Sequence, residues 1–272
     1  MTLAVCWKWV SSGGDPDDPD ARWAGVSHAD EAALEIALEL ESTHGAVTVV
    51  CVGPDGADNV LRDALAAGAA RAVRIDAPGD ADSQSVATAL AAVVAGSDYV
   101  ICGDYSSDRG TGSVPAFLAH ELGAAQALGL VAVDTATGNT TDGAMRVVRR
   151  LDGGRREVLA VAAPAVLSVE GSVRRLRRAG LSATVRSKTA AVELVASPIA
   201  SGDHHQVAAL VTPYRPRART LTPPTGSVLS RVRDILDVGG SDATTVETVE
   251  LDPAAAAARI VEQLHRWGYL CD

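Results

Sequence analysis

The chain has 272 residues, 47% of them hydrophobic and 21% charged, and its formal net charge at pH 7 is −10. This much apolar material can form a sizeable core, so a wholly disordered chain is excluded. The acidic balance also argues against a nucleic-acid-binding protein, because such proteins carry a basic surface.

The lack of a recognisable targeting signal or membrane span, together with the cysteine usage, favours a cytoplasmic protein with no direct membrane insertion. The longest nearly uninterrupted apolar run, Val158–Val169, is shorter than a membrane span of about 20 residues and contains Pro164. The start, MTLAVCWKWV, lacks the basic region and cleavage site of a signal peptide and predicts a strand instead. The cysteines form no CxxC pair, which argues against zinc and iron–sulfur sites and is typical of a reducing compartment.

Residues 1–133 alternate between strand and helix patterns. In chain order the pattern predicts strands at Leu3–Val10, Val47–Val52, Arg71–Ile75 and Tyr99–Gly103. It predicts helices at about Ala29–Thr43, Asp58–Ala67, Ser83–Ala95 and Val114–Leu122, the first of them capped by Ser27. Continuously apolar strands separated by helices indicate an α/β fold, with a doubly wound, mostly parallel sheet. Ligands of such sheets bind at the carboxyl ends of the strands.

After residue 140 the pattern changes. Met145–Leu151 and Glu157–Val161 flank Asp152-Gly153-Gly154 and predict a β-hairpin, and Ala165–Val169 predicts one more strand. Residues 171–188 are basic and are expected to be irregular, and residues 197–226 are expected to form an extended Pro-rich arm. Two helices follow, Val228–Leu236 and Pro253–Trp267. We therefore expect an α/β domain over residues 1–195 that includes the hairpin and the segment 170–188. Residues 196–272 are expected to form an extended Pro-rich arm and C-terminal helices that contact another chain.

The most informative local motif is CGDYSSDRGTGSVP, Cys102–Pro115, which leaves a predicted strand and enters a predicted helix. Glycines that let the backbone approach a ligand, followed by a helix N-terminus, are the layout of an anion site. Ser113 can donate its hydroxyl there or cap the helix. The motif is not a P-loop, since no Lys follows Gly112. On spacing alone, phosphate binding and an ordinary strand–helix loop are equal alternatives.

Several motifs together resemble the beta subunit of electron-transfer flavoproteins, over about residues 1–195. They are, in order, LAVCWKWV at Leu3–Val10, DEAALEIAL at Asp30–Leu38, Gly53-Pro54, RDALAAGAARA at Arg62–Ala72, the loop and helix of Gly103–Gln126, and the hairpin of Asp152–Val166. TPYRPR, Thr212–Arg217, echoes the tail of the family more weakly. No single motif is diagnostic, but their order and spacing are.

The resemblance implies an adenine-nucleotide α-hydrolase-like fold and a heterodimer with an alpha subunit, which carries most of the FAD. This chain would hold AMP or a second FAD, and the pair would relay electrons from a dehydrogenase to a membrane or soluble acceptor without being a stand-alone enzyme. No catalytic or metal-binding residue is implied. Carried over position by position, the nucleotide site comprises Cys6, Ser27, His28, Ala29, Asp30, Val52, Gly53, Gly103, Asp108, Arg109, Gly110, Thr111, Gly112, Ser113 and Val114.

The chain departs from the family pattern within this site. Ser27-His28 stands where the family has Asn-Pro, and Tyr105-Ser106-Ser107 stands for Gln-Ala-Ile. Arg109 adds a cation that favours an anionic phosphate, and Ser113 replaces a Gln. These departures leave AMP and FAD as alternatives. They suggest a divergent branch, for which the one associated with mycofactocin redox systems is a candidate.

The family's partner-recognition segment aligns with Glu170–Lys188. Leu181 falls on the anchoring leucine, Arg186 on a nearby lysine and Arg177 on a family arginine. The alternative for Arg174–Arg178 is a solvated basic strip, or salt bridges to the chain's own acidic surface. A stand-alone adenine-nucleotide-binding protein of the universal-stress type is the alternative function. The basic segment and the Pro-rich tail favour a subunit, since a self-contained domain needs neither.

Overall fold

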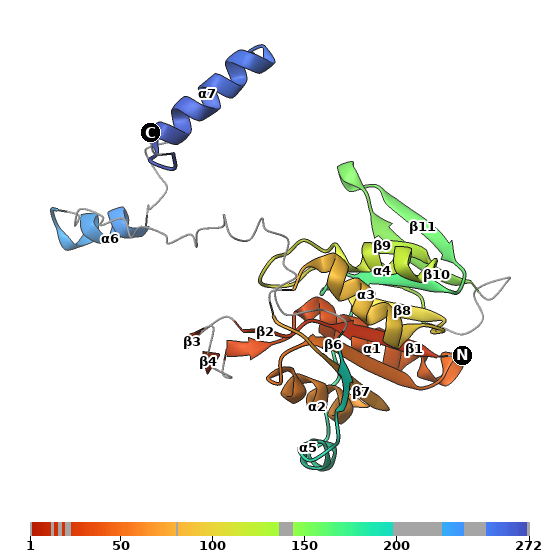
Figure 1. Cartoon of the computed structure of the whole chain (residues 1–272). Helices are drawn as coiled ribbons and strands as arrows, with labels where there is room; N and C mark the ends of the chain where they lie inside the picture. Colours follow the sequence, from red (N-terminus) through yellow and green to blue (C-terminus); the bar gives the residue numbers. More distant parts are fainter. Residues whose placement is uncertain are drawn as a thin grey trace. The chain divides into compact units, whose positions relative to one another are not determined.

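The structure is a computed structural model of the whole chain (Figure 1). It describes residues 2–11, 14–15, 18–19, 23–79, 81–135, 144–197, 225–236 and 249–270. The chain divides into two compact units, Met1–Val211 and Thr212–Asp272. Most of the predicted Pro-rich arm lies outside the described residues.

The first unit is built on a nine-stranded sheet with the order β11-β10-β9-β12-β8-β1-β6-β7-β13. Its strands are β1 (Leu3–Trp7), β6 (Val47–Gly53), β7 (Arg71–Asp76), β8 (Tyr99–Gly103), β9 (Ala125–Val133), β10 (Met145–Arg150), β11 (Arg156–Val161), β12 (Ala165–Val169) and β13 (Glu193–Ala196). Neighbouring strands are parallel, except that β10 runs antiparallel to β9 and β11. The mostly parallel α/β sheet is thus confirmed, with the predicted hairpin as β10 and β11, drawn in green in Figure 1.

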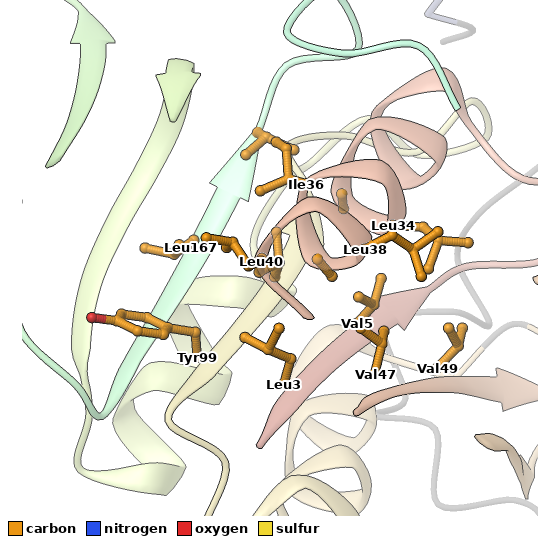
Figure 2. Packing of buried hydrophobic residues seen from close by; sticks show 14 of the residues in the cluster. Leu3, Val5, Leu34, Ile36, Leu38, Leu40, Val47, Val49, Tyr99 and Leu167 are labelled. Atoms are coloured by element: carbon orange, nitrogen blue, oxygen red, sulfur yellow. The ribbon is translucent and has the colours of Figure 1, made fainter. Parts of the chain in front are cut away.

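Helices cover both faces of this sheet. They are α1 (His28–His44), α2 (Ala57–Ala67), α3 (Ser83–Val94) and α4 (Val114–Leu122). Successive residues of β1 point to opposite faces: Leu3, Val5 and Trp7 pack in the core cluster with α1 and α2, whereas Ala4 and Cys6 pack with α3 and α4. Figure 2 shows the first cluster, in which the leucines of α1 lie over β1 and β6. The doubly wound arrangement is confirmed.

The N-terminus of α1 is fixed by its capping residue, as the sequence predicted. The Ser27 hydroxyl accepts a hydrogen bond from the Asp30 amide at 3.1 Å, and the Asp30 carboxylate accepts one from the Ser27 amide at 3.3 Å. This reciprocal pair is a capping box, which satisfies two backbone donors that a helix start otherwise leaves unpaired. The helix therefore begins at His28, one residue before the predicted start.

Four parts of the sequence prediction were wrong. The first strand ends at Trp7, and Val10 belongs to β2 (Val10–Ser11), which pairs with β5 (Ala24–Gly25). The short pair β3 (Gly14–Asp15) and β4 (Asp18–Pro19) was not predicted. Strands β9 and β13 were also missed. The segment 171–188 is not wholly irregular, because it contains α5 (Leu181–Ser187).

The second unit contributes two described helices, α6 (Val228–Leu236) and α7 (Pro253–Arg266). The bounds of α6 match the prediction, and α7 ends one residue earlier than predicted. The side chain of Asp252 accepts hydrogen bonds from the amides of Ala254 and Ala255, and Pro253 occupies the first helical position. Both features favour a helix start at this point.

Candidate functional site

The strand order of the sheet places a crevice beside β1. The chain runs from β1 outward to β6 and β7, and then returns across β1 to form β8. Connections leave the carboxyl ends of β1 and β8 in opposite directions, and α/β sheets bind ligands at such a switch point. A cleft lies at these strand ends. Ten of the predicted site residues line it: Cys6, Asp30, Val52, Gly53, Gly103, Arg109, Thr111, Gly112, Ser113 and Val114.

The other five predicted residues lie beside the cleft and do not line it. Ser27, His28 and Ala29 form the start of α1, where Ser27 is the capping residue. Asp108 and Gly110 belong to the loop that runs from β8 to α4. These residues belong to the two segments that border the cleft without contributing to its lining.

Gly103, at the end of β8, allows α1 to approach the sheet closely. A Cβ atom on Gly103 would lie 2.7 Å from Asp30 Oδ1 and 2.9 Å from the Asp30 amide nitrogen, closer than real Cβ contacts. The first turn of α1 therefore packs against bare backbone at the edge of the cleft. A similar approach occurs at Gly171, whose Cβ would lie 3.0 Å from the Ala29 amide nitrogen.

Asp30 is a buried carboxyl group at the floor of the cleft, with a relative exposure of 5%. Burial raises its pKa to about 7, although hydrogen bonds from Ser27 and from the backbone of Lys8 and Gly103 act to lower it. The Trp7 indole donates a hydrogen bond to the Asp30 carbonyl oxygen at 2.6 Å and fixes the backbone of this turn. Asp30 is therefore only partly ionised near neutral pH.

Two thiols stand side by side on the cleft wall. Cys6 on β1 and Cys102 on β8 are register partners, and both line the cleft. A hydrogen bond with Cys102 and burial raise the pKa of Cys6 well above its ordinary value. Burial likewise raises the pKa of Cys51 to about 12. Cys6 and Cys51 therefore stay protonated at physiological pH. All three buried cysteines pack as small apolar groups, as expected for cysteines on strands.

The loop between β8 and α4 is held by charged contacts to its surroundings. Lys8 Nζ lies 2.7 Å from Asp108 Oδ1 and 2.6 Å from Asp108 Oδ2. Although burial acts in the opposite direction, hydrogen bonds from Lys8 and Ser106 lower the pKa of Asp108 to about 2. Arg109 donates to the Ala81 carbonyl oxygen at 3.0 Å, which ties the loop to the start of α3. The loop is thus anchored on two sides of the cleft.

Gly112 is required where this loop turns into α4. Its φ of +58° lies in the left-handed region, and a Cβ atom would lie 2.3 Å from the Asp104 carbonyl oxygen. The next residue, Ser113, makes no capping hydrogen bond to α4, so the capping alternative was wrong. The Ser113 hydroxyl lies 3.1 Å from the Thr111 hydroxyl instead.

Comparisons with known proteins give this architecture a family. The sequence profile of the electron transfer flavoprotein domain matches residues 21–200. The chain belongs to the electron transfer flavoprotein family. A Syntrophomonas wolfei protein named electron transfer flavoprotein subunit beta is 31% identical over 179 residues, which cover 64% of this chain and 69% of that protein. The Methylophilus methylotrophus protein of the same name is 31% identical over 185 residues, covering 65% and 69%. Protein FixA of Rhizobium meliloti is 33% identical over 213 residues, 69% of each chain.

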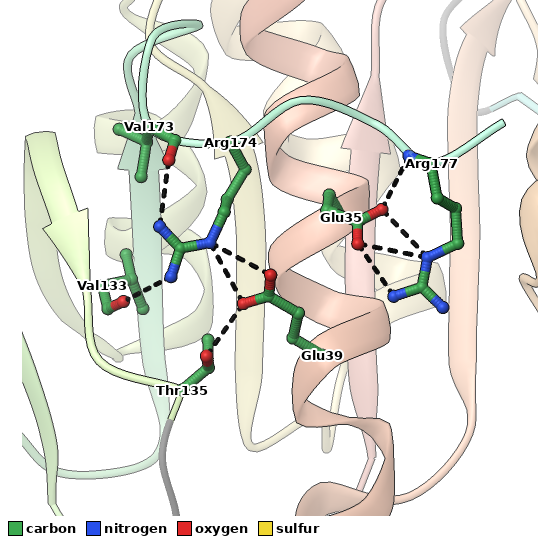
Figure 3. A network of polar contacts seen from close by, with 7 residues as sticks. All are labelled: Glu35, Glu39, Val133, Thr135, Val173, Arg174 and Arg177. Atoms are coloured by element: carbon green, nitrogen blue, oxygen red, sulfur yellow. Dashed lines mark hydrogen bonds and ion pairs between the residues drawn. The ribbon is translucent and has the colours of Figure 1, made fainter.

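The region that matches the flavoprotein family also includes the basic segment after β12, residues 171–188. Figure 3 shows two of its arginines against α1. Arg177 Nη2 lies 2.9 Å from Glu35 Oε1, and Arg174 Nε lies 3.1 Å from Glu39. Arg174 and Arg177 therefore form salt bridges with the chain's own acidic residues, which is one of the alternatives given for the basic segment. Although burial opposes it, the hydrogen bonds and charge of Arg177 lower the pKa of Glu35.

The same segment presents an apolar side chain to solvent. Leu181, the first residue of α5, is 81% exposed. Arg186 donates to the Ser182 hydroxyl at 2.6 Å on the same helix. Of the residues implied for partner docking, only Leu181 offers a large exposed apolar group, while Arg177 and Arg186 have contacts within the chain.

Several residues that line the cleft were not among the predicted site residues. Lys8 and Trp9 follow β1 directly, and Pro54 follows β6. Tyr105 and Ser106 belong to the loop after β8. The signal was present, since polar or bulky residues that directly follow a buried strand lie at the ligand-binding edge of a parallel sheet.

Among the residues that the structure describes, no group of three or more His, Cys, Asp or Glu side chains is arranged to hold a metal ion. None of the helices in the described parts of the chain has the length and apolar character that crossing a membrane requires.

Proposed function

We propose that this chain is the beta subunit of a heterodimeric electron transfer flavoprotein that holds AMP or FAD in the cleft. The observation that carries the proposal is the cleft itself, at the switch point between β1 and β8, with the glycine-containing loop entering α4 beside it. Together with an alpha subunit, it would relay electrons from a dehydrogenase to a downstream acceptor. We further propose that it works in the cytoplasm and is a carrier rather than a stand-alone enzyme.

The lining of the cleft fits an adenine nucleotide. Val52, Val86 and Leu90 supply apolar walls, which suit a heterocyclic base. Arg109 supplies a cation for a phosphoryl group, and Gly103 and Gly112 line the cleft with backbone that carries no side chain. The N-terminus of α4 adds the positive end of a helix dipole.

In this proposal the flavin supplies the redox chemistry, and the protein binds, orients and shields the groups. The Cys6 thiol that lines the cleft stays protonated, so it adds no negative charge next to a bound phosphoryl group. The partly protonated Asp30 limits the negative charge on the cleft floor in the same way. The chain's own residues thus provide a weakly charged, mostly apolar nucleotide site.

The alpha subunit is proposed to dock on two parts of the chain. Leu181 is the anchor within segment 170–188, because it is the larger and more exposed of the two exposed apolar side chains there, at 81% against 59% for Val185. In the second unit, α7 and the residues after it carry exposed Ile260, Trp267 and Tyr269, which suit burial in an interface. The Arg177–Glu35 pair is proposed to set the position of the segment that carries Leu181.

Co-expression with the neighbouring gene product tests the proposal. We expect a yellow complex of two distinct chains with the visible absorbance of a flavin, and a nucleotide that is released on denaturation. The mass of the released molecule distinguishes AMP from FAD. A colourless, stable monomer that binds ATP would contradict the proposal and support a stand-alone protein of the universal-stress type.

A further inference from the structure

Lys8 occupies a particular place at the mouth of the cleft. It is the first residue after β1 and lines the cleft, and its side chain is 35% exposed. Its ammonium group contacts both carboxylate oxygens of Asp108 and lies 3.4 Å from the Ser106 hydroxyl. An ammonium group has three donors, so the loop after β8 occupies all of them.

Asp108, unlike Lys8, is not one of the residues that line the cleft. It lies in the loop that runs past the cleft into α4. Its carboxyl stays ionised at physiological pH because its pKa is about 2. The ion pair joins residues 100 positions apart. It ties this loop to the end of β1 and keeps the Lys8 charge at the cleft mouth.

The other charged side chains that line the cleft have different contacts. Arg109 donates to the Ala81 carbonyl oxygen, toward α3. Asp30 lies buried in the capping box at the start of α1. Lys8 thus pairs with Asp108, which belongs to the loop between β8 and α4. This is the loop that we expect to receive an anionic group.

We propose that Lys8 binds the phosphoryl group of the cleft's nucleotide, and that Asp108 holds the ammonium in position and partly neutralises it. This inference rests on the proposed function and adds a binding residue to it. A phosphoryl oxygen replaces part of the contact with the loop, while the adenosine portion of the ligand does not depend on the Lys8 charge. Lys8 therefore determines how strongly the cleft prefers a phosphorylated ligand over the nucleoside.

The chain offers a matched control, because Lys8 and Lys188 are its only lysines. The experiment measures the affinities of AMP and of adenosine for the full chain by calorimetry after removal of bound nucleotide. In Lys8→Gln, the preference for AMP over adenosine should fall roughly tenfold, as expected for loss of a hydrogen bond to a charged group. Lys188→Gln removes the same charge at an exposed site and should leave the preference unchanged. Asp108→Asn keeps a side-chain oxygen that can hold the ammonium but removes the neutralising charge, so it should increase the preference.

The outcomes separate the inference from the proposed function. If the unmodified chain binds neither nucleotide, the proposed function fails, and this inference fails with it. If it binds AMP but Lys8→Gln weakens AMP and adenosine equally, Lys8 has only a structural role and the inference alone is overturned.

A second measurement on the unmodified chain avoids any folding defect of the variants. Acetylation by an N-hydroxysuccinimide ester, followed by peptide mass analysis, reports the accessibility of each lysine. AMP should protect Lys8 and leave Lys188 unaffected, whereas adenosine should protect neither. Equal acetylation of Lys8 with and without AMP would overturn the inference.

Discussion

At the scale of single residues, Asp30 helps to cap a helix in a buried position where its ionised form is unfavourable. Its carboxylate completes the capping box of α1, yet it is almost fully buried at the cleft floor. The sequence could predict the cap from the spacing of Ser27 and Asp30. It could not predict the burial, which depends on Gly103 of a distant strand approaching within contact distance. Local hydrogen bonds are encoded in adjacent residues, but burial is set by the tertiary fold.

The raised pKa of Asp30 predicts a pH-dependent stability. Because this pKa, about 7, lies above the roughly 3.9 of an unfolded aspartate, the folded chain binds more protons between these values. The free energy of unfolding should therefore fall as the pH rises through this window, by at most about 1.4 kcal/mol per unit. In Asp30→Asn, which keeps the size and an acceptor, this part of the slope should disappear. Urea unfolding of both proteins at pH 5, 6, 7 and 8 measures the difference, and parallel curves would contradict the assignment.

The glycine at the end of β8 gives a second residue-scale prediction. Gly103→Ala would force a Cβ atom to within 2.7 Å of Asp30 Oδ1. We expect the free energy of unfolding to fall by about 1–3 kcal/mol, as for other overpacked sites. Gly180→Ala is the control, because nothing lies within 4 Å of its Cβ and its φ of −68° suits alanine. Chemical denaturation of both variants provides the test, and equal losses would show that the close approach is not tight.

At the scale of elements, the sequence predicted those with strong local signals. The bounds of β8, β12 and α4 were predicted correctly, because a glycine or proline marks one end of each: Gly103 ends β8, Pro164 precedes β12 and Gly123 follows α4. Strand β9 was missed because Gly129 interrupts it and its side chains are only partly buried. Edge strand β13 leaves Leu194 61% exposed, and short α5 exposes Leu181 and Val185, so neither shows an amphipathic pattern. Elements without a buried face give no periodic signal.

Helix α5 carries the prediction for partner docking. Leu181→Ala should weaken binding of the alpha subunit by about 1.5–3 kcal/mol, the value of burying one leucine. Any single arginine change in 174–178 should cost less, since a surface ion pair contributes about 0–1 kcal/mol. Leu194→Ala, at an exposed leucine outside the docking segment, is the control and should change little. Affinities from surface plasmon resonance would decide, and a larger loss for an arginine variant would remove Leu181 as the anchor.

At the scale of the whole molecule, the site depends on contacts between distant parts of one unit. The glycines of the loop after β8 indicated a ligand site from sequence. Lys8 was missed because the predicted strand Leu3–Val10 included it, whereas β1 ends at Trp7. Its pairing with Asp108, 100 positions away, follows from no local pattern. The topology that brings them together is the return of the chain from β7 across β1 to β8. A switch point of this kind follows from strand order, which spacing along the chain does not specify.

The division into two units predicts how the chain responds to truncation. All strands of the main sheet, both core clusters and the cleft lie within Met1–Val211. A chain ending at Val211 should therefore fold and bind AMP within a few-fold of the full chain, since the residues proposed to hold the nucleotide are retained. It should lose affinity for the alpha subunit, because α7 and its exposed apolar groups are removed. Calorimetry with AMP and size-exclusion chromatography with the alpha subunit measure the two properties. Retained partner binding would show that segment 170–188 is sufficient for docking, whereas loss of AMP binding would mean that the second unit contributes to the cleft.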